Sequence, residues 1–174
     1  MKRFGAGLVM SLVAVTCFAP AQQASQAARW EGWQTLIGFW VGEGDPAQGV
    51  SHFSFLPDLQ GKILIRKNHA EYPATKDRPA TVHDDLLIVY GETEADRKAV
   101  YFDNEGHVIE YAVSVSADRK TIVFVSPPAA GAPRYRLSYF EQDRDRFRIT
   151  FEIAPPGRPE AFAPYLEGFA RRRT

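Results

Sequence analysis

The chain has 174 residues, of which 45% are hydrophobic and 13% aromatic, and its 21 basic and 21 acidic side chains give a formal net charge of zero. Without a basic excess we expect no nucleic-acid partner. A single cysteine excludes an internal disulfide framework, so stability must come from one packed core, which a chain of this length can bury.

The first 21 residues predict a secretory signal peptide. Lys2 and Arg3 precede an apolar run from Leu8 to Phe18, and Ala19-Pro20-Ala21 supplies small residues at the spacing that signal peptidase requires. The run of about a dozen residues is short for a membrane span, which needs roughly 20. We therefore expect an exported protein, periplasmic or secreted, cleaved after Ala21 or Ala27 and not inserted in the membrane.

Retention through a lipid on Cys17 is the alternative fate. Thr16 stands where a lipidation signal has a smaller Gly or Ala, so the sequence favours cleavage. Cleavage after Ala21 removes the only cysteine and two basic residues, which leaves 19 basic and 21 acidic residues and a charge of about −2. Such a domain has no thiol and no charge that would favour an anionic membrane.

The segment before the first predicted strand divides in two. Residues 22–28 are rich in Gln, Ala and Ser, and we expect them to be loose. From Arg29 to Ile37, Trp30, Trp33 and Leu36 recur at three-to-four spacing, which predicts one or two helical turns with an apolar stripe. We expect this short helix to cover one end of a single domain, residues 29–174.

The rest of the chain alternates β-rich runs with turn signals at intervals of about 8 to 15 residues, the rhythm of an all-β protein. Asp, Asn and Gly occupy the turns, and the prolines fall between the runs. Connections this short forbid parallel crossovers, so we expect an antiparallel meander closed into a barrel. The ten predicted strands are Phe39–Gly44, Val50–Leu56, Lys62–Tyr72, Thr81–Glu92, Lys98–Phe102, Val108–Ser116, Thr121–Val125, Tyr135–Glu141, Arg146–Ile153 and Tyr165–Arg172.

Alternation within strands predicts which side chains face inward. Between Arg146 and Ile153 the odd positions are apolar and the even ones polar, so the odd face belongs to the interior and Glu152 points outward. The strand from Lys62 to Tyr72 begins with apolar residues and continues with polar ones. This pattern is expected of a strand that runs from the packed end of a barrel to its solvent-exposed end. Function is therefore expected at the end opposite the helix.

Gly38-Phe39-Trp40, in a first strand after a short helix, is similar to the G-x-W signature of the lipocalins and the wider calycin group. The layout from Trp33 to Arg172 most resembles the nitrobindin-like and DUF1579-type bacterial calycins. The resemblance implies a ten-stranded antiparallel barrel with a closed base and one cavity. Gly38 and Trp40 then have structural roles at that base.

The same resemblance raises the question of whether the barrel binds haem. Nitrobindins hold haem through a histidine near the start of the last strand, where this chain has Pro164-Tyr165-Leu166, and no histidine follows His107. Tyr165 offers a tyrosinate as the alternative iron ligand. We predict no cofactor, with haem as the alternative that a titration tests.

The four histidines predict no metal site. No pair has His-x-His spacing and no Glu/His constellation is typical of zinc. His52 and His69 share a face as diagonal neighbours if Phe53 opposes Arg66, and lie on opposite faces if the register slips by one residue. His83-Asp84-Asp85 reads either as an acid/base trio or, preferably, as a solvated strand entrance, and His107 as a residue at the barrel mouth.

The sequence carries no Gly-x-Ser-x-Gly elbow and no mature cysteine, so we do not predict an enzyme; Glu110 and Arg66 are the least implausible acid/base participants. The prediction is instead a barrel that binds a small, mainly apolar or amphipathic ligand in its interior. The first alternative is a structural or interaction module whose barrel interior is filled with side chains. A hydrolase is the less favoured alternative. The candidate ligand-binding residues are Arg66, Tyr101, Glu110, Tyr111, Arg136 and Tyr165. Two arginines would favour an anionic head group.

Overall fold

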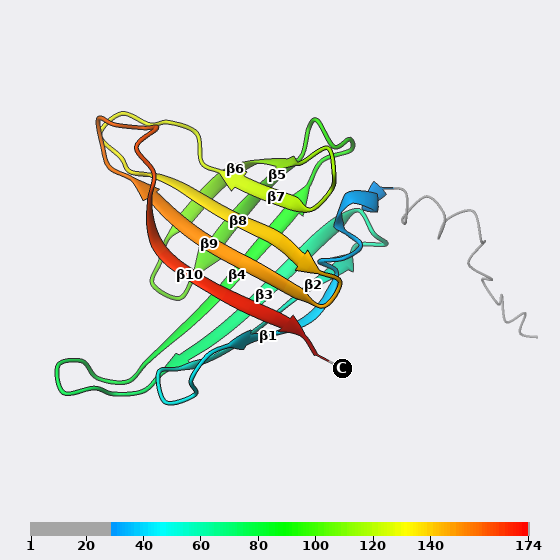
Figure 1. Cartoon of the computed structure of the whole chain (residues 1–174). Helices are drawn as coiled ribbons and strands as arrows, with labels where there is room; N and C mark the ends of the chain where they lie inside the picture. The colour runs from blue at the N-terminus through cyan, green and yellow to red at the C-terminus, as the bar shows by residue number, and fades with distance from the viewer. Residues whose placement is uncertain (1–28, 174) are drawn as a thin grey trace, which may run out of the picture.

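Ten antiparallel strands form one closed barrel (Figure 1). The computed structural model describes residues 29–173. Each strand pairs with its neighbours in sequence, and β1 closes the barrel by pairing with β10, with Trp40 opposite Arg172. The strands are β1 (Gly38–Glu43), β2 (Val50–Asp58), β3 (Ile63–Tyr72), β4 (Thr81–Tyr90), β5 (Lys98–Asp103), β6 (Val108–Val115), β7 (Thr121–Val125), β8 (Arg134–Asp143), β9 (Arg146–Ala154) and β10 (Ala163–Arg172).

This architecture confirms the predicted all-β antiparallel meander closed into a barrel. The ten strands are those expected, with ends that differ by two residues or fewer. The predicted signal peptide, Cys17 and the segment 22–28 lie outside the described residues. Within residues 29–173, no helix has the length and apolar character that a membrane span requires.

The segment before β1 covers one end of the barrel (Figure 1). Its helix is a single 3₁₀ turn, η1 (Glu31–Trp33), shorter than the predicted one or two α-helical turns. Trp30 and Trp33 are buried, the Trp30 indole N–H donates to the Gly61 carbonyl at 2.8 Å, and the Arg97 guanidinium lies 4.0 Å from the centre of the Trp30 ring. The turn between β2 and β3 therefore holds this segment in place.

Gly38 and Trp40 join this segment to the barrel. Gly38 has a φ of +138°, and a Cβ there would lie 2.6 Å from Arg172 Nη1, so no other residue fits without strain. The Trp40 indole N–H donates to the Leu36 carbonyl at 2.8 Å, and the Arg172 guanidinium lies 4.4 Å from the centre of the Trp40 ring. The expected structural roles of Gly38 and Trp40 fit this geometry.

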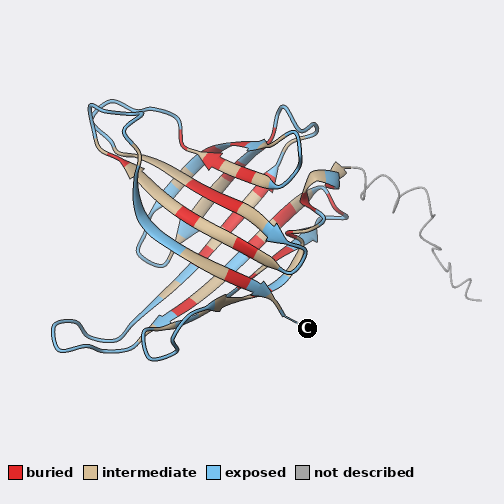
Figure 2. Ribbon diagram, viewed as in Figure 1, coloured by how far each residue is buried: buried red, intermediate tan, exposed pale blue. Residues whose placement is uncertain are grey.

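The interior has two halves along the barrel axis, one packed with side chains and one that contains a cavity. Figure 2 shows buried residues alternating with half-buried and exposed ones along the strands. The half next to η1, which we call the closed half, is packed with large side chains that are almost inaccessible to solvent. Several of its rings contact one another at centroid distances of 5.0–6.3 Å. The closed half comprises Trp30, Trp33, Leu36, Trp40, Phe55, Leu64, Leu87, Val89, Ala99, Ile122, Phe124, Tyr139 and Phe147. The rest of the interior is the open half.

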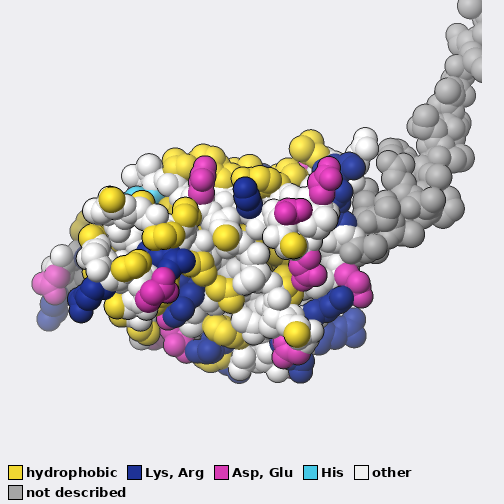
Figure 3. Space-filling view, turned by 90° about the horizontal axis from the view of Figure 1, so that it is seen from above, with side chains coloured by type: hydrophobic (Ala, Val, Ile, Leu, Met, Phe, Trp, Pro, Cys, Tyr) yellow, Lys and Arg dark blue, Asp and Glu magenta, His cyan; other side chains and the backbone are white. Residues whose placement is uncertain are grey.

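The outer face carries paired charges. Arg136 bonds Glu152 through two nitrogens at 2.6 and 2.7 Å, and Arg146 bonds Glu43 at 2.8 Å. Figure 3 shows basic and acidic side chains interspersed with hydrophobic ones on the face seen from above. Neither sign of charge dominates that face.

Candidate ligand-binding site

The open half contains a cavity of about 730 Å³. Residues of every strand except β7 line it, and so do residues of the β3–β4 and β5–β6 loops, which lie at the end opposite η1. Ligand pockets in proteins commonly measure about 300–1,000 Å³, so this volume suits a small organic molecule. The cavity lies at the end where the sequence placed function.

One side of the cavity is polar. Alternating positions of β3, β4 and β5 point inward, and registers such as Arg66 opposite Leu87 bring their polar residues into one surface. We call this surface the polar wall; it consists of Arg66, Asn68, His83, Asp85, Tyr101 and Asp103.

The opposite side is apolar. Inward positions of β8, β9 and β10 supply aliphatic and aromatic side chains, and the Tyr135 and Phe151 rings stack with planes 7° apart and centroids 5.9 Å apart. We call this surface the apolar wall; it consists of Tyr135, Leu137, Ile149, Phe151, Ile153 and Leu166. A molecule between the two walls would meet hydrogen-bonding groups on one side and hydrocarbon on the other.

Asp85 is the centre of the polar wall. It forms a buried ion pair with Arg66, accepts a hydrogen bond from the Asn68 amide at 3.0 Å, and lies 3.4 Å from His83 Nε2. Burial is the largest single effect on Arg66 and by itself lowers its pKa, but the Asp85 carboxylate together with three nearby tyrosines more than offsets burial, so the pKa is raised overall. Arg66 is therefore a cation that is already neutralised by its partner.

His83 connects the wall to the mouth. Hydrogen bonding to Asp85 is the main cause that raises the pKa of His83 to about 9, although burial acts to lower it. Glu105, whose Oε1 lies 3.0 Å from His83 Nδ1, adds to the rise. At neutral pH the ring is therefore protonated. The polar wall thus contains cations and carboxylates in close pairs rather than one sign of charge.

Tyr101 and Asp103 extend this network along β5. The Tyr101 hydroxyl donates to Asp103 Oδ2 at 3.2 Å and lies 3.2 Å from His83 Nε2; burial is the main cause of its raised pKa. Burial also acts to raise the pKa of Asp103, but hydrogen bonds from the backbone and ring of His107 more than offset it and lower that pKa. Tyr101 is therefore a neutral donor, and Asp103 is an anion at neutral pH.

Three of the six candidate binding residues meet inside the cavity: Arg66, Tyr101 and Tyr111. Tyr165 lies at the mouth, 72% exposed, with its ring edge-to-face on Phe151 of the apolar wall. The other two lie elsewhere. Arg136 points outward to Glu152, and Glu110 is exposed on the outer face of β6.

This placement corrects two interpretations of the sequence. An anionic head group was expected to meet two arginines, but Arg136 is outside and Arg66 is paired with Asp85. Glu110 and Arg66, named as acid/base participants, lie on opposite faces of the barrel wall, so the structure does not assemble that pair.

The histidines also lie differently from the expectation. His52 pairs directly with His69 on the outer face, with ring centroids 5.2 Å apart, because Phe53 opposes Asn68 rather than Arg66. The preferred solvated reading of His83-Asp84-Asp85 is wrong for two of its members, because His83 and Asp85 point inward and only Asp84 faces solvent. His107 lines the mouth, as predicted.

Sequence reasoning missed Asn68, His83, Asp85 and Asp103 as members of the site. A signal for two of them was present, since His83 and Asp85 share the parity of Leu87 and Val89, the apolar inward positions of the same strand. Asp103 ends a strand beside a turn, and nothing local distinguishes it from an ordinary turn aspartate.

Comparisons with known proteins add distant structural likenesses. No family model matches the chain, and no curated protein matches it significantly. Among solved structures, it is similar to pallilysin from Treponema pallidum, with 14% identity and a TM-score of 0.39 over 90% of this chain and 98% of the other. It is also similar to the S-type phycobiliprotein lyase CPES from Guillardia theta, with 12% identity and a TM-score of 0.44 over 88% of this chain and 98% of the other. Likenesses at this level say nothing about a ligand.

Proposed function

We propose that this protein binds a small, mainly apolar molecule with a hydrogen-bonding edge in the open half of its barrel. The observation that carries the proposal is the cavity of about 730 Å³ between a polar and an apolar wall. A filled barrel acting only as a structural module would place bulky side chains in this volume, as the closed half does. The chain resembles the nitrobindin-like and DUF1579-type calycins in layout, and the N-terminal segment supports binding outside the cytoplasm.

The chemistry of the polar wall narrows the class of ligand. Arg66 is paired with Asp85, and His83 lies between Asp85 and Glu105, so both cations of the wall face carboxylates. The Asp103 carboxylate accepts hydrogen bonds from Tyr101 and His107. An unpaired charged ligand group would have to compete with these pairs and lose its hydration. A carbonyl, hydroxyl or amide edge instead hydrogen-bonds to such groups, while the rest of the molecule contacts the apolar wall.

The experiment is a binding screen on the tag-free protein, with an environment-sensitive fluorescent dye as the probe and fatty acids, retinoids and haem as competitors. We expect the dye to bind and a mainly apolar competitor to displace it. A Soret shift on titration with micromolar haem would favour the haem alternative.

Two tryptophan substitutions on one strand form a matched pair for this screen. Ile149→Trp adds bulk to the apolar wall and is expected to abolish dye binding, whereas Arg148→Trp adds the same bulk on the outer face and leaves it unchanged. If both variants bind dye as the parent does, the ligand does not occupy the cavity and the proposal fails.

A further inference from the structure

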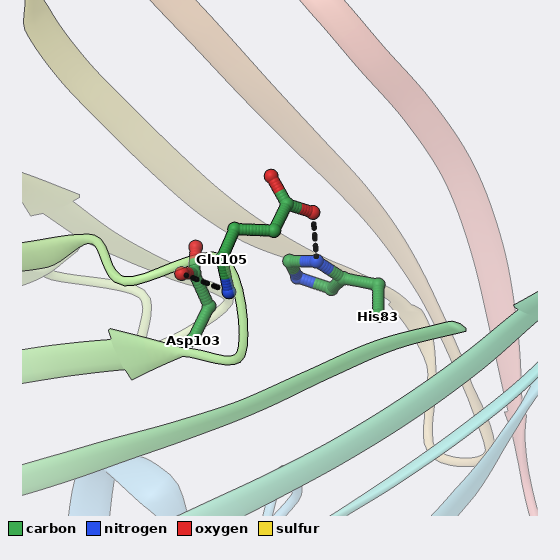
Figure 4. Close-up of side chains that lie close together, drawn as sticks. All are labelled: His83, Asp103 and Glu105. Atoms are coloured by element: carbon green, nitrogen blue, oxygen red, sulfur yellow. Dashed lines mark hydrogen bonds and ion pairs between the residues drawn. The ribbon is translucent and has the colours of Figure 1, made fainter. Parts of the chain in front are cut away.

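We infer that His83, Asp103 and Glu105 form a binding site for a divalent transition-metal ion such as Zn²⁺ at the mouth of the barrel. One potential ligand atom from each of the three residues lies within 4.8 Å of the other two. Figure 4 shows the Glu105 carboxylate directed at the His83 ring, with Asp103 beside it. One imidazole nitrogen and two carboxylate oxygens are a donor set that Zn²⁺ accepts.

The fold positions each ligand separately. His83 points inward from β4, Asp103 ends β5, and Glu105 lies in the turn that leads to β6. Asp103 Oδ1 accepts hydrogen bonds from the backbone N–H groups of Glu105 and His107 at 3.0 and 2.9 Å, so the turn is folded around this carboxylate. The loop that carries Glu105 is thereby held against the residue that would share its metal.

The distances require a local rearrangement. Ligand atoms around a tetrahedral zinc with bonds of about 2.1 Å are separated by about 3.4 Å. His83 Nδ1 and Glu105 Oε1 are 3.0 Å apart, and one ring nitrogen of His83 and one oxygen each of Asp103 and Glu105 lie within 4.8 Å of one another. Bringing three atoms around one ion requires rotation of the exposed Glu105 side chain and a shift of Asp103 Oδ2, which would exchange its contacts with the Tyr101 hydroxyl and the His107 ring for the ion.

The other ring nitrogen of His83, Nε2, lies near a carboxylate, as the non-ligating nitrogen of a metal-bound histidine commonly does. An ion that binds Nδ1 displaces the proton of that nitrogen to solvent, and Nε2 keeps its hydrogen. Nε2 lies 3.4 Å from Asp85 Oδ2 and 3.2 Å from the Tyr101 hydroxyl. Asp85 is fixed in turn by Arg66 and Asn68. Such a carboxylate behind a ligating histidine fixes the tautomer and the orientation of the ring.

His69 on the outer face is a natural control. It also contacts two carboxylates, but Asp84 Oδ1 lies 2.7 Å from Nδ1 and Glu71 Oε1 lies 2.9 Å from Nε2. One ion bound to either nitrogen would therefore reach only one of these carboxylates. Among residues 29–173, only the group at the mouth brings a histidine and two acids around one point.

The test is calorimetric titration of the tag-free, chelator-treated protein with Zn²⁺, without organic ligand, so that the result is independent of the proposed ligand binding. We expect binding of one ion per chain and a rise in Tm with Zn²⁺. His83→Gln and Glu105→Gln should each weaken the affinity by at least about 10-fold, and His69→Gln should not change it.

Glu105 lies in an exposed turn, so Glu105→Gln keeps the fold and gives a result even if His83→Gln destabilises the barrel. The inference is overturned if the parent protein binds no Zn²⁺, or if both His83→Gln and Glu105→Gln bind it as tightly as the parent. Equal loss in His69→Gln would move the site to the outer face and would also overturn it.

Discussion

The closed and open halves of this barrel are built from the same strands but do different things. In β3, for example, Leu64 belongs to the closed half, whereas Arg66 and Asn68, the next inward positions, face the cavity. In β4, Leu87 and Val89 are core, and His83 and Asp85 form part of the polar wall. Strand alternation determines only whether a side chain faces the interior or the solvent. The distance of an inward-facing position from Trp30, Trp33 and Trp40 in the closed half decides whether it belongs to the core or to the cavity.

The first and largest expected difference is in stability. Trp33 contacts Phe55 and Phe124 and is buried, so Trp33→Ala should lower the free energy of unfolding by about 3–5 kcal/mol. Ile149→Ala, at a half-buried position beside the cavity, should cost only about 1–2 kcal/mol. Urea unfolding followed by circular dichroism measures both. Equal losses would mean that the open half is as tightly packed as the closed half.

The second prediction concerns the buried pair in the polar wall. Asp85→Ala leaves the Arg66 cation buried without its partner and should destabilise the protein by about 3 kcal/mol. The double variant Arg66→Met/Asp85→Leu removes both charges and should recover most of that stability while it alters dye binding. Thermal and urea denaturation provide the stability measurement.

If the double variant is no more stable than Asp85→Ala alone, the loss comes from packing and not from the unpaired charge. Unaltered dye binding in the same variant would separate the ligand from the polar wall and would weaken the contrast between the two halves.

The third and smallest effect at neutral pH concerns Tyr139, a buried residue of the closed half. The Tyr139 hydroxyl is buried and has no hydrogen-bond partner within the described part of the chain, so Tyr139→Phe should be neutral or stabilising by up to about 1 kcal/mol. A loss of more than about 1 kcal/mol in urea unfolding would show that the hydroxyl has a polar partner. The cavity would then extend into the closed half.

The same residue predicts a pH dependence. Burial raises the pKa of Tyr139 to about 12, above the value of about 10 in an unfolded chain, so the folded state favours the neutral phenol. Its contribution to stability is complete below pH 10 and is lost as the pH rises through 12. Tyr139→Phe should therefore make the alkaline loss of stability shallower. Unfolding followed from pH 8 to 12 tests this, and identical slopes for the two proteins would contradict it.

Much of the fold could be predicted because the signals are local. Period-two alternation, turn residues at regular spacing and short connections specify ten antiparallel strands, and those strands are present. The tryptophans before and within the first strand and the glycine at position 38 located the closed end. The polar second half of the third strand indicated that Arg66 and the inward positions after it line a polar interior and not the apolar core.

The site was only partly predictable because it depends on contacts between residues distant in sequence. Arg136 and Glu110 are polar residues in strands rich in aromatic neighbours, yet their parity directs them outward. Conversely, Asp85 reads locally as a solvated acid, and only the register of β4 against β3 places it beside Arg66 and Asn68.

The sequence by itself thus determined the strands, their order and the end that is plugged, because these follow from backbone periodicity and from large side chains near the start of the domain. The tertiary structure alone decided the strand registers that give the cavity one polar and one apolar wall, and the volume between these walls. It also decided that His83, Asp103 and Glu105 lie close together. Those features arise when the barrel closes, since closure fixes how far each strand is displaced against the next.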